Sequence, residues 1–103
     1  MKVININFSG GTETLVMQDY KCLIQGTGTL NSNYTINFSG SPFIGKTLLL
    51  FFKGLVNRAS YNFNVLGTNL TVTQLNRDST IEAVFNGTTW DLNVYINTVS
   101  DDW

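Results

Sequence analysis

The clearest chemical pattern runs from Gly40 to Thr47, which reads G-S-P-F-I-G-K-T and matches the phosphate-binding G-x-x-x-x-G-K-[ST] loop. In such a loop, backbone N–H groups wrap the phosphates at the start of a helix, the lysine reaches the outer phosphates and the hydroxyl binds Mg²⁺. The residues that follow argue against this use, because Leu48 to Phe52 is uniformly apolar and has no wet face for a surface helix. We therefore expect a strand after Thr47 and no nucleotide site.

Other catalytic residue types are scarce. The chain has no histidine, which removes the commonest general base, and one cysteine, Cys22, which then has no imidazole to activate it. We expect Cys22 to be a buried, unreactive thiol, because it lies in the apolar stretch from Tyr20 to Ile24. The sequence predicts no enzyme: no catalytic, cofactor-binding or metal-ligating residue is assigned, and no cofactor is expected.

Glu82 and Asp91 are the carboxylates that the pattern brings closest, since it predicts that they face each other across a hairpin. A Ca²⁺ site, or an acid and base pair of the glycosidase type, is the functional alternative there. The plain interpretation is a polar strand surface with two like charges opposed, which is mildly unfavourable.

The elements that would position these residues are strands. Apolar residues alternate with Asn or Thr in Ile4–Phe8, in Tyr34–Phe38 and in Tyr61–Val65, a period of two that predicts half-buried strands. With 13 Asn, 13 Thr and only 13% charged residues, the composition suits turns and wet strand faces. We expect one all-β domain over residues 1–103, an antiparallel, jelly-roll-like β-sandwich of about eight or nine short strands.

The C-terminal hairpin is the best-supported local element. Asn86-Gly87 predicts a two-residue type I′ turn, which places Phe85 opposite Thr88, Ala83 opposite Trp90 and Ile81 opposite Leu92. All six then lie on one mostly apolar face, and a one-residue slip would invert every side chain.

The segment Thr47–Phe52 is apolar on both faces, so both sides must be covered. One side can be the domain core and the other a neighbouring subunit. A short repeat, in which Ile6–Gly10 recurs as Ile36–Gly40, predicts two similar strand-and-turn units rather than a solenoid.

Five aromatic residues could form a sugar-stacking platform, as in carbohydrate-binding modules, or could instead provide a core anchor at Trp90 and an interface rim of tyrosines. They are Trp90, Tyr95, Tyr61, Tyr34 and Trp103. We expect the anchor-and-rim arrangement, with Trp103 docked on a partner if it is ordered.

Charge and hydropathy restrict the partners. Six basic and seven acidic residues are scattered along the chain, so no nucleic acid is expected. The longest apolar run, Leu48–Phe52, is far below the ~20 residues of a membrane helix, and no signal peptide is visible at the start. The expectation is synthesis in a cytoplasm, with no membrane association.

The segment Ser79–Leu92, S-T-I-E-A-V-F-N-G-T-T-W-D-L, resembles the strand-turn-strand ending of β-rich virion proteins of tailed bacteriophages, such as head fibres and tail-fibre modules. The run from Lys46 to Val72 is similar in style. The resemblance implies a structural virion protein that decorates the capsid or tail as a homotrimer. A terminal segment, Met1–Phe8 or Ser100–Trp103, would contact another virion protein, and a host surface glycan is the possible ligand.

Overall fold

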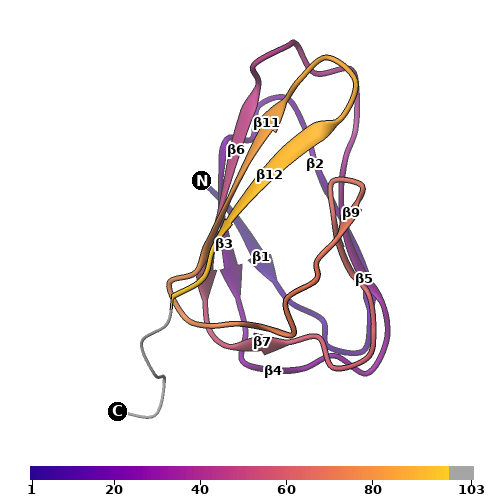
Figure 1. The fold of residues 1–103 in the computed structure, drawn as a ribbon, viewed down its shortest axis with the longest axis vertical. Coiled ribbons are helices and arrows are strands. Elements are labelled where there is room, and N and C mark those ends of the chain that lie inside the picture. The colour runs from indigo at the N-terminus through magenta and orange to yellow at the C-terminus, as the bar shows by residue number, and fades with distance from the viewer. Residues whose placement is uncertain (98–103) are drawn as a thin grey trace.

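The protein is described from a computed structural model, which places residues 1–97. Within this range the chain forms twelve strands and no helix (Figure 1). The strands are β1 (Lys2–Asn5), β2 (Gly11–Leu15), β3 (Lys21–Gln25), β4 (Gly28–Thr29), β5 (Tyr34–Phe38), β6 (Thr47–Lys53), β7 (Val56–Asn57), β8 (Phe63–Val65), β9 (Thr68–Asn69), β10 (Gln74–Leu75), β11 (Thr80–Phe85) and β12 (Trp90–Tyr95). The all-β prediction is confirmed. No helix in this part of the chain is long and apolar enough to cross a membrane.

The strands form three sheets that the chain visits repeatedly in the same order. The five-stranded sheet has the order β1-β3-β6-β11-β12, the three-stranded sheet β10-β7-β4 and the four-stranded sheet β2-β5-β8-β9. The chain runs three times from the five-stranded sheet, past the three-stranded sheet, to the four-stranded sheet, and we call each such passage a winding. The first winding is β1 to β2, the second is β3 through β4 to β5, and the third is β6 through β7 to β8. After β8 it reverses and passes the same three positions backwards, as β9, β10 and β11.

This path explains the mixed strand directions. Strands of successive windings pair in parallel, as β1 with β3, β3 with β6 and β5 with β8. The returning winding pairs antiparallel, as β9 with β8, β10 with β7 and β11 with β6. The sheets are therefore mixed: the prediction of an antiparallel sandwich is wrong for the three windings, and a jelly roll is not confirmed. Alternating polarity defines the buried face of a strand but not the direction of its neighbour, which is why the pattern missed the parallel pairs.

The core lies between the three sheets, as Figure 1 shows with β6 and β12 on one side, β4 and β7 across the base and β5 and β9 on the other side. Every second residue of β6 points into it, since Leu48, Leu50 and Phe52 have no exposed surface. Tyr34 and Phe63 come from the opposite sheet, and their ring centroids are 5.6 Å apart. The ring of Phe63 also lies 6.2 Å from that of Phe52, so aromatic contacts span the core from sheet to sheet.

The C-terminal hairpin has the predicted strands but a different turn. Phe85 pairs with Trp90, Ala83 with Leu92 and Ile81 with Val94, so the register is shifted by two residues from the predicted one. The backbone N–H of Asn86 donates to the carbonyl of Thr89 (3.0 Å), which makes Gly87 and Thr88 the central residues. Of these two only Gly87 has a positive φ, 103°, and a leading glycine fits a type II′ turn rather than type I′.

The side chain of Asn86 accounts for the shift. Its Oδ1 accepts hydrogen bonds from the backbone N–H groups of Thr88 and Thr89, both at 2.9 Å, which holds Asn86 at the end of the strand. A shift of two keeps each side chain on its predicted face, so Ile81 and Ala83 are buried as expected. The predicted division of the hairpin into an apolar and a polar face is thus confirmed, although the register is not.

The short repeat does not mark equivalent positions. Ile36 and Phe38 lie in β5, whereas Ile6–Gly10 follows β1 and forms the turn toward β2. The number of residues between paired positions differs from one winding to the next, since Lys2 pairs with Cys22 but Lys21 pairs with Leu49. The prediction of two similar strand-and-turn units is therefore wrong, and turns of different length keep the three windings from appearing as a repeat in the sequence.

Candidate functional site

The segment that matches a phosphate-binding loop is a structural turn. Thr47 opens strand β6 rather than a helix, and its Oγ1 donates to the carbonyl of Gly45 at 3.2 Å. The Lys46 side chain is 7% exposed, and its Nζ donates to the carbonyl oxygens of Met17 (3.0 Å) and Asp19 (2.6 Å). The lysine thus ties this turn to the β2–β3 connection, and its ammonium is directed at carbonyls rather than at a phosphate position.

The two carboxylates of the hairpin do not face each other. Glu82 pairs with Asn93, and Asp91 pairs with Val84, so the two acids lie diagonally on the polar face. Asp91 Oδ1 instead accepts a hydrogen bond from Asn86 Nδ2 at 3.1 Å. The predicted opposed pair is therefore not formed, because the register differs from the predicted one. Across residues 1–97, no group of three or more Cys, Asp or Glu residues is arranged to hold a metal.

Cys22 lies in the core on β3 and has no exposed surface. Burial, with a smaller contribution from the nearby Asp19 carboxylate, raises its pKa to about 11. A thiol with so little thiolate at neutral pH is a poor nucleophile. The predicted burial of Cys22 is confirmed, and its low reactivity stays a prediction.

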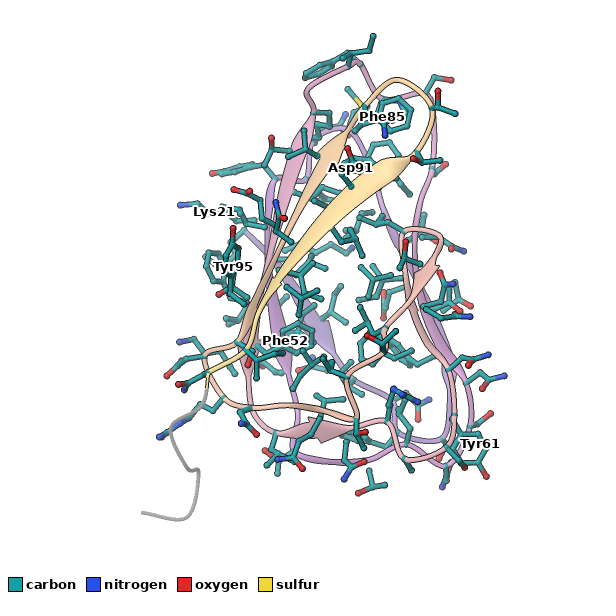
Figure 2. All side chains as sticks on the ribbon, viewed as in Figure 1. Lys21, Phe52, Tyr61, Phe85, Asp91 and Tyr95 are labelled. Atoms are coloured by element: carbon teal, nitrogen blue, oxygen red, sulfur yellow. The ribbon has the colours of Figure 1, made fainter. Side chains whose placement is uncertain are left out.

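The aromatic residues proposed as a sugar platform are dispersed. Tyr34 is buried in the core, where desolvation raises its pKa to about 12 with a further contribution from Glu13. Tyr61 and Tyr95 lie at opposite sides of the molecule (Figure 2). Trp90 and Tyr95 point to opposite faces of β12, because they are an odd number of residues apart. Trp103 lies outside the described residues. The four of these residues that the structure describes therefore form no common platform.

Comparison with protein-family models, curated proteins and solved structures finds no match to this chain. The candidate sites are consequently those that the geometry of the chain itself defines. Two surfaces stand out, one on each side of the five-stranded sheet.

The first surface is the outer face of the five-stranded sheet, on the side away from the core. One row crosses all five strands in register, with Val3 beside Leu23, Leu23 beside Phe51, Phe51 beside Thr80 and Thr80 beside Tyr95. Leu49 and Val84 add apolar area in the neighbouring rows. The two ends of the row are open to solvent, since Val3 is 50% and Tyr95 58% exposed. Exposed apolar patches are typical of interaction sites, so this largely apolar row makes the outer face a candidate surface.

Charged residues flank the apolar row on that outer face. Lys21 on β3 pairs with Leu49, and Leu49 pairs with Glu82 on β11, so one basic and one acidic residue stand on either side of β6. Asp91 on β12 lies beyond Glu82 on the acidic side of the sheet. Figure 2 shows Lys21 and Tyr95 projecting from the outside of the sheet while Phe52 points into the core. The face is thus basic toward one edge and acidic toward the other.

The second surface is a cleft of about 720 Å³ at the end of the molecule where the hairpin turns. Three turns meet there: Ser39–Pro42 after β5, Leu66-Gly67 between β8 and β9, and Asn86–Thr89 between β11 and β12. Trp90 lines it with Phe38 and Phe85, whose ring centroids are 5.3 Å and 5.4 Å from that of Trp90. Phe38 and Phe85 did not figure among the predicted aromatic candidates. No sequence signal joins Phe38 to Trp90, because Phe38 arrives from another sheet, whereas Phe85 lies on the hairpin face that the pattern also assigned to Trp90.

Proposed function

We propose that this chain is a non-enzymatic structural protein of a bacteriophage virion, a head or tail fibre or decoration component that acts as a homotrimer attached to other virion proteins. The observation that supports self-association is the outer face of the five-stranded sheet, with its in-register row from Val3 to Tyr95. Support for the virion setting comes from the resemblance of Ser79–Leu92 to phage fibre endings. The protein would then be located in the virion after synthesis in the host cytoplasm.

The β6 strand explains why the outer face suits a subunit contact. Leu49 and Phe51 stay half-buried although no layer formed by residues 1–97 covers their side of the sheet. A second copy would cover them and remove apolar surface from water, at roughly 25 cal/mol per Å². The same strand is fully buried on its inner side, so a subunit contact would satisfy the requirement that both sides be covered.

The charges on that outer face fit a ring of copies. When β3 of one copy lies against β11 of the next, Lys21 of the first approaches Glu82 of the second. A contact between two different edges of the same face is heterologous, and such contacts form a ring when the rotation from copy to copy closes. Three copies around an axis would bring all three outer faces together, with apolar rows inside and alternating charges between subunits.

The experiment measures the mass of the purified protein by light scattering and sedimentation. We expect about three times 11.5 kDa. Lys21→Glu and Glu82→Lys should each favour dissociation, because each places like charges in contact, and the double variant should restore the trimer. Thr14→Glu is the control, since Thr14 is an exposed residue of β2 in the four-stranded sheet, away from this face. A stable monomer or dimer, or single variants that remain trimeric, would overturn the proposed assembly.

The virion setting needs a separate measurement. Purified particles from the phage genome that encodes this chain should contain the chain in a copy number divisible by three, measured by quantitative mass spectrometry. Its absence from the particles would exclude a virion role without affecting the trimer.

A further inference from the structure

The cleft at the hairpin end has a lining unlike the rest of the surface. Its apolar part consists of three rings together with Pro42 and Leu66. Its polar part consists of glycines and hydroxyl residues, and no charged residue belongs to the lining. The full set is Phe38, Gly40, Ser41, Pro42, Leu66, Gly67, Thr68, Phe85, Gly87, Thr88, Thr89 and Trp90. A pocket of this volume lies within the range of small-ligand sites, roughly 300–1,000 Å³.

The absence of charge from this lining restricts the ligand. Phosphates and carboxylates are held by Arg, Lys or helix ends, and hard cations by carboxylates, and the cleft has none of these. A purely apolar ligand would leave the hydroxyls at the rim without partners. The ligand class that fits both halves of the lining is neutral, carries many hydroxyls and has an apolar face.

The hydroxyls that could meet such a ligand are available. Ser41, Thr68 and Thr88 are exposed, and no hydrogen bond within residues 1–97 engages their side-chain oxygens. Thr89 differs, because its Oγ1 accepts a hydrogen bond from Asn86 Nδ2 at 3.2 Å. The three available hydroxyls come from three different turns, so they surround the aromatic rings instead of lying in one row.

The ring cluster is held in place before any ligand binds. Trp90 lies between Phe38 and Phe85 in tilted and edge contacts, at 55° and 61° between ring planes. The turn beside it is fixed by the hydrogen bonds to Asn86, and a Cβ on Gly87 would lie 3.1 Å from Ile44 Cγ1. A preformed site loses little conformational entropy on binding.

We propose that this cleft binds a neutral saccharide. The C–H face of a pyranose ring packs on the aromatic cluster of Trp90, where polarised C–H groups meet the negative face of a π-system. Sugar hydroxyls exchange hydrogen bonds with Ser41, Thr68 and Thr88. The site lies within one chain and is lined by inward-facing residues of the hairpin, so it does not depend on the proposed trimer.

The test is a binding measurement with the full chain in a Trp103→Phe background, where Trp90 is the only remaining tryptophan. The probes are an array of neutral gluco-, galacto- and manno-oligosaccharides, with sialylated and sulfated glycans for comparison. Hits are titrated to 10 mM by tryptophan fluorescence and saturation-transfer NMR. We expect saturable binding of at least one neutral glycan, with a change in Trp90 emission.

Variants then locate the site. Thr88→Val and Ser41→Ala remove exposed hydroxyls without disturbing the core, and each should weaken binding about two- to ten-fold, as the loss of one hydrogen bond does. Trp90→Leu should abolish it, with circular dichroism as the check on folding. Thr71→Val is the control, because Thr71 is an exposed threonine outside the cleft.

Three outcomes would overturn the proposal: no neutral glycan bound at 10 mM, binding confined to charged glycans, or binding unchanged by both Thr88→Val and Ser41→Ala. None of them bears on the mass measurement that tests the trimer, so the two proposals can fail separately.

Discussion

The two faces of the five-stranded sheet carry similar apolar residues but differ in how far the chain buries them. On the inner face, Cys22, Leu50 and Phe52 are fully buried by the other two sheets. On the outer face, Val3 is 50% and Tyr95 58% exposed, although both belong to the same five-stranded sheet. The chain therefore covers one face of the sheet by folding, and under the proposed assembly a neighbouring copy would cover the other. Changes on the inner face should therefore unfold the chain, and changes on the outer face should dissociate it.

The largest difference should appear in thiol reactivity. Cys22 on the inner face can react only when the chain opens, so its alkylation by iodoacetamide should be slowed by the unfolding equilibrium, at least about 10³-fold against denatured protein. Val3→Cys in a Cys22→Ala background places a thiol one strand away on the outer face, where it should react at the rate of a free thiol when the chain is dissociated. Fast alkylation of native Cys22 would contradict the closed inner face.

The next effect separates two adjacent residues of β6. Phe52→Ala should cost about 3–5 kcal/mol of unfolding free energy, because it leaves a cavity beside Phe63. Phe51→Ala, one residue earlier on the half-buried outer side, should cost only about 1 kcal/mol in the monomer but should prevent trimer formation. Urea unfolding and light scattering measure the two quantities. Equal losses of stability would show that the faces do not differ as described.

Alkaline pH should lower the free energy of unfolding by a few kcal/mol. The pKa of Cys22 is raised to about 11 and that of Tyr34 to about 12, above the ordinary values of 9.0 and 10.0 that apply to the unfolded chain. The neutral forms are therefore favoured in the folded state, so their contribution is intact below pH 9 and is lost as pH rises through 11 to 12. Each group adds a slope of about 1.4 kcal/mol per pH unit, for a loss on the order of 3 kcal/mol by pH 11.

Urea unfolding at pH 8 to 11 measures this alkaline loss of stability. Tyr34→Phe removes one titrating group from the core while keeping the ring, so its decline with pH should be shallower than that of the wild type. A free energy of unfolding that stays level up to pH 11 would contradict the assignment.

Most of what the sequence could predict came from the alternation of residues along a strand, which decides the face that each side chain occupies. It identified the buried residues of β11 correctly, and it survived the wrong turn at Asn86-Gly87 because a shift of two residues preserves the face. Strand direction was missed, since the same alternation fits a parallel neighbour reached through a corner and an antiparallel one reached through a hairpin. The segment from Gly26 to Gly28 illustrates this, because it forms the corner between β3 and β4, which lie in different sheets.

The two candidate surfaces were only partly predictable for the same reason. The apolar outer side of Thr47–Phe52 is visible in the sequence, but its extension to Val3 and Tyr95 depends on pairing across five strands. Trp90 was recognised as a candidate, whereas its neighbour Phe38 comes from another sheet and a different winding. Contacts between distant segments depend on loop lengths and winding offsets, and these follow no fixed period in this chain.

The smallest expected effect is also the most selective, because it compares two exposed tyrosines. Tyr95 is 58% exposed on the outer face and Tyr61 is 39% exposed away from that face, on another side of the molecule (Figure 2). Tyr95→Ser and Tyr61→Ser should each change the monomer's free energy of unfolding by less than about 0.5 kcal/mol, since neither ring is buried in the chain. Only Tyr95→Ser should weaken the trimer, because only Tyr95 would lose apolar contact with a neighbouring copy. Sedimentation over a dilution series measures this, and equal trimer stability in the two variants would place the subunit contact elsewhere on the surface.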